Sequence, residues 1–135
     1  MTELPDEKKM ICLAVYGEDE DFFTLKGSVE SILEVLNCRG ELDYRPSERC
    51  YMHPSRSAEI SVGDTNVGYM GELNPVLAEK LGIEKRVYVA ELSFAEIESL
   101  SCDKVSFKAI AKYPSVERDL ALLADVDTTN AEIIA

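Results

Sequence analysis

One short stretch of the sequence, residues 53–75, holds the side chains best suited to chemistry. It contains the only histidine of the chain, His53, and an arginine shortly after it, Arg56. An imidazole can act as a general acid or base near neutral pH, and a guanidinium can clamp an anion. Glu59 and Glu72 are the acidic partners available to these two side chains. A small enzyme that uses His53, Arg56 and Glu72 is therefore one hypothesis for the chain.

Other features of the same stretch favour a structural role. No serine or cysteine accompanies these residues in a nucleophile context, and neither a GxxxxGKS/T nor a GxGxxG phosphate loop occurs. In an alternating strand, Arg56 and Glu59 point to opposite faces. Cys50 and His53 have a possible ligand spacing, but a zinc site needs three or four ligands and no second pair is nearby. We therefore predict no catalytic, cofactor-binding or metal-binding residue.

The composition is that of an acidic globular protein. The 135 residues carry 26 acidic and 14 basic side chains, which gives a formal net charge of −12. A nucleic-acid-binding protein needs a basic surface, so this net charge argues against nucleic-acid binding by the chain as a whole. It leaves open a stand-alone interaction module that binds a basic partner. Without a CxxC pair, an apolar span or a signal peptide, the sequence predicts a cytoplasmic protein with reduced thiols.

Hydrophobic patterns predict the elements that must position these residues. An apolar, β-favouring run predicts a buried strand over 10–17. Apolar residues at helical period, from Phe22 to Leu36, predict a helix that ends at Asn37 or Gly40.

Alternating patterns predict further strands and two short helices. The predicted strands cover residues 41–46, 56–62, 67–73 and 86–92, and the second and third form a hairpin around the turn 63–66. Asn74 as N-cap and Pro75 at the first helical position predict a helix over 74–82. Ser93, followed by Glu96, predicts capped helical turns over 93–100. Together they predict an α+β fold, an antiparallel sheet flanked by helices.

The charge balance of the sequence changes after residue 103. Residues 104–118 hold four basic residues against Glu117 alone, a local reversal of the overall charge. A short strand, Pro114, a second strand over 118–125 and the start of a helix are predicted next. A strand and a helix start cannot bury a face alone, so we expect residues 104–135 to be the truncated start of another domain.

Four blocks follow one another in a distinctive order along the chain. They are DFFTLKGSVESIL (21–33), MHPSRSAEI (52–60), GYMGELNPVLAEKLG (68–82) with VYVAEL (87–92), and KYPSVERDLALLAD (112–125). In this order they resemble the C-terminal part of the beta subunit of bacterial phenylalanyl-tRNA synthetases. Ser55, Asn74 and Glu117 depart from the family pattern, which has glycine, histidine and arginine there.

The resemblance implies a fold for each part of the chain. Residues 1–103 would be the end of a catalytic-like module with the class II aminoacyl-tRNA synthetase fold, which has lost its catalytic residues. Residues 104–135 would be a linker and the start of a ferredoxin-like anticodon-binding domain. Because only its first strand and a helix start are present, we do not expect the fragment itself to bind tRNA.

The resemblance also implies a function. The parent enzyme would be an α2β2 heterotetramer that charges tRNA(Phe) with phenylalanine, using ATP and magnesium, with its active site in the alpha subunit. The fragment would be a non-catalytic part that supports and assembles with the alpha subunit, and it would hold no cofactor of its own.

Overall fold

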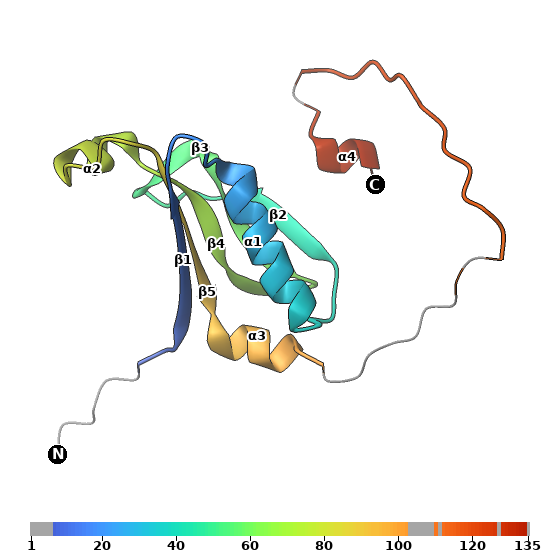
Figure 1. Ribbon diagram of the computed structural model, residues 1–135, viewed down its shortest axis with the longest axis horizontal. Helices are drawn as coiled ribbons and strands as arrows, with labels where there is room; N and C mark the ends of the chain where they lie inside the picture. Colours follow the sequence, from blue (N-terminus) through green and yellow to red (C-terminus); the bar gives the residue numbers. More distant parts are fainter. Residues whose placement is uncertain (1–6, 103–109, 111, 127, 135) are drawn as a thin grey trace. The chain divides into compact units, whose positions relative to one another are not determined.

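The computed structural model describes residues 7–102, 110, 112–126 and 128–134, and the chain divides into two units, Met1–Val105 and Ser106–Ala135. The first unit contains one five-stranded antiparallel sheet with the strand order β1-β5-β4-β3-β2 (Figure 1). Its strands are β1 (Met10–Tyr16), β2 (Leu42–Pro46), β3 (Met52–Val62), β4 (Thr65–Leu73) and β5 (Val87–Ser93). Its helices are α1 (Phe22–Val35), α2 (Pro75–Lys80) and α3 (Phe94–Leu100). The predicted α+β class and antiparallel sheet are confirmed.

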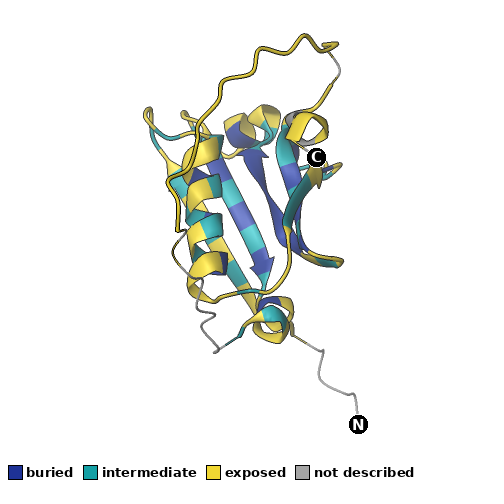
Figure 2. Cartoon of the chain, turned by 90° about the vertical axis from the view of Figure 1, so that its right-hand side faces the viewer, coloured by how far each residue is buried: buried dark blue, intermediate teal, exposed yellow. Residues whose placement is uncertain are grey.

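Helix α1 packs against one face of the sheet and closes the hydrophobic core. Its apolar stripe places Leu25, Val29 and Leu33 in the interior, because these residues recur at helical spacing. They join sheet residues that share one face through the strand register, including Ile60, Met70, Ala90 and Leu92. The buried residues of the strands are shown in Figure 2. Burying one such aliphatic side chain is worth about 1.5–3 kcal/mol.

Most predicted elements of the first unit are confirmed, with four corrections. Strand β1 is present but is not buried as predicted, because it lies at the edge of the sheet and its residues alternate between exposed and half-buried. The turn predicted over 63–66 covers only residues 63–64, because Thr65 already pairs with Val62 in the ladder. Strand β3 begins at Met52, earlier than the predicted Arg56, because Met52 pairs with Leu73 across an irregularity in the ladder before Ser57. The predicted side-chain cap at Ser93 is wrong, because Ser93 makes no capping hydrogen bond and ends strand β5 instead. Helix α2 begins as predicted, with the Asn74 side chain accepting from the backbone N–H of Val76.

Close backbone packing fixes one glycine of the sheet. Gly68 in β4 has a φ of 155°, and a Cβ at this position would lie 2.2 Å from the carbonyl oxygen of Glu91 in β5. Only a residue without a side chain allows β4 and β5 to approach so closely.

In its described residues, the second unit contains one short helix, α4 (Asn130–Ile134). Thr129 and Glu132 form a reciprocal capping box at its start, and the predicted helix start is confirmed. The strand predicted over 118–125 is wrong: these residues form no regular secondary structure, and their side chains are exposed. A strand needs a neighbour to take its backbone hydrogen bonds, and the described residues of this unit provide none. The short strand predicted before Pro114 falls largely outside the described residues.

Candidate functional site

A buried carboxylate lies where strands β3, β4 and β5 come together. Glu72, near the end of β4, is only 3% exposed. The Nε atom of Arg56 in β3 lies 2.7 Å from its Oε2, and the Nε atom of Arg86, just before β5, lies 3.9 Å from its Oε1. The Arg56 N–H is not aimed at the carboxylate, so the contact is an ion pair without a regular hydrogen bond. Two guanidiniums thus compensate the charge that burial would otherwise make costly.

His53 contacts the outer side of Arg56. The backbone N–H of Ser55 donates to Nδ1 of His53 at 3.1 Å, while Nε2 of His53 lies 2.8 Å from Nη2 of Arg56. A neutral imidazole has one acceptor nitrogen and one N–H. Both neighbours of the ring are donors, so the Ser55 N–H and the Arg56 guanidinium compete for the single acceptor nitrogen of neutral His53.

A cavity of about 700 Å³ adjoins the ion pairs, between helix α2 and the segment that leads into β5. Its apolar walls come from Leu73, Pro75, Ala78, Ile83 and Val87. Its charged lining consists of Arg56, Glu72, Glu79, Glu84, Lys85 and Arg86. Lys85 also pairs with Glu18 at 2.9 Å. Positive and negative groups balance formally, with the two arginines gathered around Glu72.

Glu59 belongs to a different cluster, on the face of the sheet opposite α1. Arg49 donates to both of its carboxylate oxygens, from Nε at 2.8 Å and from Nη2 at 3.2 Å. Ser47 and Asn66 donate to the same carboxylate at 2.7 and 3.3 Å. Burial acts to raise the pKa of Glu59, but the hydrogen bonds from Arg49, Ser47 and Asn66 outweigh it and lower the pKa.

Two tyrosines complete this cluster. The guanidinium of Arg49 stacks 3.8 Å from the ring centre of Tyr69, and Tyr51 meets the same ring edge-on. The Tyr69 hydroxyl donates to Glu91 of β5. Burial, and then the hydrogen bond to Glu91, raise the pKa of Tyr69 well above its usual range. The arrangement is a closed set of charge-assisted contacts, in which each charged side chain already has a partner.

The structure brings together three of the four side chains singled out in the sequence and separates the fourth. His53, Arg56 and Glu72 lie in one cluster, whereas Glu59 lies on the other face with Arg49, as strand alternation predicts. Sequence reasoning missed Arg86. Its nearness follows only from the β4–β5 register, in which Glu72 faces Tyr88, and no local spacing signals it.

Metal ligation has no support in the described ranges. No group of three or more His, Cys, Asp or Glu side chains there is arranged to hold an ion, and the Cys50–His53 pair gains no further ligand. Nor do the helices of these ranges include one with the length and apolar character needed to cross a membrane.

Comparison with known proteins gives one consistent family. The family model described as "Phenylalanyl tRNA synthetase beta chain CLM domain" matches residues 1–94. Among curated proteins, the chain is 36% identical over 132 residues to the phenylalanine–tRNA ligase beta subunit of Clostridium acetobutylicum, covering 97% of this chain and 16% of that protein. It is 38% identical to the beta subunits of Symbiobacterium thermophilum and Bacillus licheniformis, covering 94% and 96% of this chain and 15% and 17% of theirs. The chain thus spans about a sixth of the length of these relatives.

Proposed function

The chain belongs to the phenylalanyl-tRNA synthetase beta-chain family, and we propose that it is a non-catalytic, structural part of an enzyme that joins phenylalanine to tRNA(Phe) using ATP. Its role is to support the assembly of the beta subunit with an alpha subunit that holds the active site. The observation that carries the proposal is the match of almost the whole chain to a small part of the relatives named phenylalanine–tRNA ligase beta subunit.

The contacts of the candidate residues support a structural role. Glu72 is buried and engaged by two arginines, so it is poorly placed to take a proton from a substrate. Glu59 is likewise engaged by Arg49, which in turn stacks on Tyr69. Both carboxylates fix strands and loops relative to one another.

The same proposal covers the finer fold assignments and the cofactors. Residues 1–103 are the end of a class II-like catalytic module, and residues 104–135 are the start of a ferredoxin-like anticodon-binding domain. The antiparallel sheet with α1 on one face and the sequence block at 112–125 support these assignments. ATP and magnesium belong to the parent enzyme. The described residues do not provide a fitting magnesium site, so we derive no step through that ion.

Assembly is the second part of the proposal, with an α2β2 heterotetramer in the cytoplasm as the parent complex. A pull-down of the purified chain with a bacterial alpha subunit tests it directly. Retention of the alpha subunit on the immobilised chain is the expected result. Failure of the folded chain to retain it, while a full-length beta subunit does so under the same conditions, would contradict an assembly role for this part.

Catalysis is tested separately, with the chain alone. Incubation with ATP, magnesium and phenylalanine should give no pyrophosphate exchange above the buffer blank. Reproducible exchange that is lost in His53→Ala would overturn the non-catalytic assignment in favour of a small enzyme. A complex of the alpha subunit with full-length beta subunit serves as the positive control.

A further inference from the structure

We propose that the arginine-lined end of the 700 Å³ cavity binds a small organic carboxylate that carries an apolar group. The inference concerns Arg56, Arg86 and the walls around them, and it does not depend on the proposed assembly role. Three observations carry it: an arginine whose terminal nitrogens make no hydrogen bond to other described residues, two donors that compete for one acceptor nitrogen of His53, and a local charge that matches one negative group.

Arg86 is the arginine whose terminal nitrogens have donors to offer. Its only ion pair within the described residues is the 3.9 Å contact of Nε with Glu72, too long for a hydrogen bond, and its side chain is 63% exposed. The terminal nitrogens make no hydrogen bond to other described residues. A guanidinium held loosely by one carboxylate can offer its terminal N–H groups to a second, bidentate carboxylate.

The competing donors meet at His53. The Ser55 N–H lies 3.1 Å from Nδ1 and the Nη2 of Arg56 lies 2.8 Å from Nε2, but a neutral imidazole has only one acceptor nitrogen. A carboxylate oxygen placed beside Arg56 would accept from the guanidinium and relieve this competition. The cavity reaches Arg56, so a ligand in it can approach this guanidinium.

Charge and shape indicate which anion fits. Arg56, Arg86 and Glu72 together carry a net charge of +1, which matches a monoanion better than a phosphate dianion. The neighbouring walls are aliphatic, formed by Leu73, Pro75, Ala78, Ile83 and Val87. An apolar group attached to the carboxylate would displace water from these walls.

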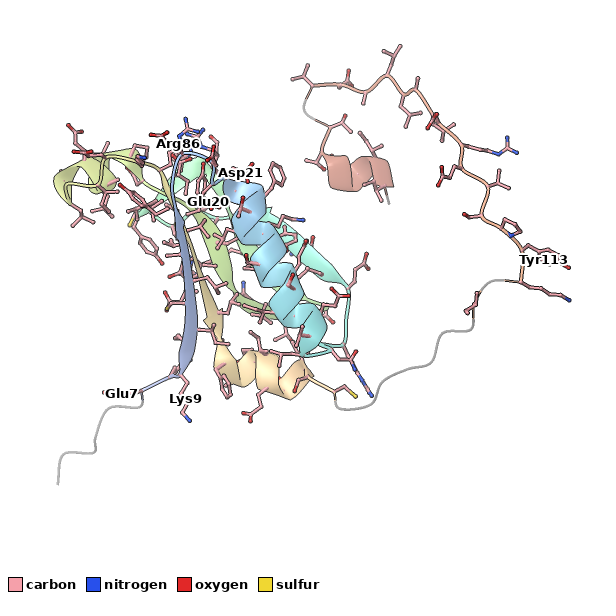
Figure 3. The ribbon with its side chains drawn as sticks, viewed as in Figure 1. Glu7, Lys9, Glu20, Asp21, Arg86 and Tyr113 are labelled. Carbon is pink, nitrogen blue, oxygen red and sulfur yellow. The ribbon has the colours of Figure 1, made fainter. Side chains whose placement is uncertain are left out.

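Acidic neighbours restrict where the carboxylate can lie. Glu20, Asp21 and Arg86 line a second cavity of about 530 Å³ and lie at the same end of the first unit (Figure 3). Glu79 and Glu84 line the first cavity. Their charge repels an anion, so the site lies between Arg86 and Arg56, and binding is expected in the millimolar range rather than tighter.

A titration with sodium benzoate at constant ionic strength tests the proposal. The probe is followed by the ¹⁵N–¹H signals of the arginine Nε–H groups in the labelled chain. Saturable shifts of the Arg56 and Arg86 signals at millimolar benzoate are expected. Benzamide, a neutral molecule of nearly the same shape, and inorganic phosphate should leave these signals unshifted in the same range.

Two variants assign the binding to Arg86. Arg86→Gln keeps the Arg56–Glu72 pair and should weaken benzoate binding at least tenfold. Arg45→Gln is the matched control, because Arg45 is 79% exposed in strand β2 and pairs with Asp43 instead. The proposal is overturned if benzoate gives no saturable shift, if benzamide or phosphate shifts the signals equally, or if the two variants weaken binding alike.

Discussion

Removing the Arg56 guanidinium tests the ion pair of Glu72, the one buried carboxylate among the described residues. In Arg56→Met the aliphatic part of the side chain is retained, but Glu72 keeps only the distant Arg86, whose Nε lies 3.9 Å away. Glu72 is 3% exposed, so after the substitution water can replace the lost partner only from the adjoining cavity. The variant therefore tests whether the ion pair stabilises the junction of β3, β4 and β5.

The expected size of the effect follows from burial. Removing one partner of a fully buried ion pair costs about 3–5 kcal/mol. The Arg56 side chain is 41% exposed, so solvent already screens part of the interaction, and Arg86 compensates a little more. We expect a loss of about 2 kcal/mol in the free energy of unfolding, since screening lowers the worth of exposed pairs.

Urea unfolding followed by circular dichroism measures this loss, and a second substitution identifies its cause. Glu72→Gln in the Arg56→Met background removes the uncompensated charge, so the double variant should recover most of the lost stability. A loss below about 0.5 kcal/mol for Arg56→Met, the size typical of surface substitutions, would refute the reasoning. So would a double variant that is no more stable than Arg56→Met.

Three further predictions test other parts of the first unit, two of them with a control variant. Gly68→Ala should lower the free energy of unfolding in urea by about 3 kcal/mol or more, because the new Cβ would lie 2.2 Å from the carbonyl oxygen of Glu91. Gly27→Ala is the control: it lies in α1 with open space around the Cβ, and it should be neutral or stabilising. Burial acts to raise the pKa of Glu59, but its hydrogen bonds hold the pKa below its ordinary value. This residue therefore contributes stability that is lost as the pH falls through its folded-state pKa. Glu59→Gln should therefore be less stable at neutral pH and lose less stability on acidification, and equal pH profiles in urea unfolding would contradict this. Asp21→Ala removes the N-cap of α1 and should lower the free energy of unfolding, measured in the same way, by about 1 kcal/mol. Asp21→Ser is the control, because a serine can also cap the helix, and it should keep most of this stability.

Much of the first unit could be predicted from the sequence because its signals are local. The apolar stripe that begins at Phe22 predicted α1, and the alternation on either side of residues 63–66 predicted the β3–β4 hairpin. Asn74 and Pro75 gave the start of α2. Each of these patterns is set by residues near one another in the chain, and local propensity and tertiary structure agree there.

The wrong or missed predictions concern residues whose structure depends on partners far away in the sequence. Residues 118–125 have a strand-like pattern, but a strand exists only beside a second one, and none is present in the described residues of that unit. Arg86 joined the site through the pairing of β4 with β5, which no spacing near Glu72 reveals. Ser93 looked like a helix cap, yet its backbone pairs with Met10 of β1.

Strand β1 lies at one edge of the sheet and pairs, among the described residues, with β5 alone. Its sequence, MICLAVY, contains no charged residue, so the strand itself does little to discourage pairing with another chain. The net charge of −12 provides that protection for the molecule as a whole, by mutual repulsion. Such repulsion acts over about 8 Å at physiological ionic strength and shortens as salt is added. The colloidal stability of the isolated chain therefore depends on buffer composition: it should be greatest in dilute, neutral buffer and least in concentrated salt or near the isoelectric point of about 4.5.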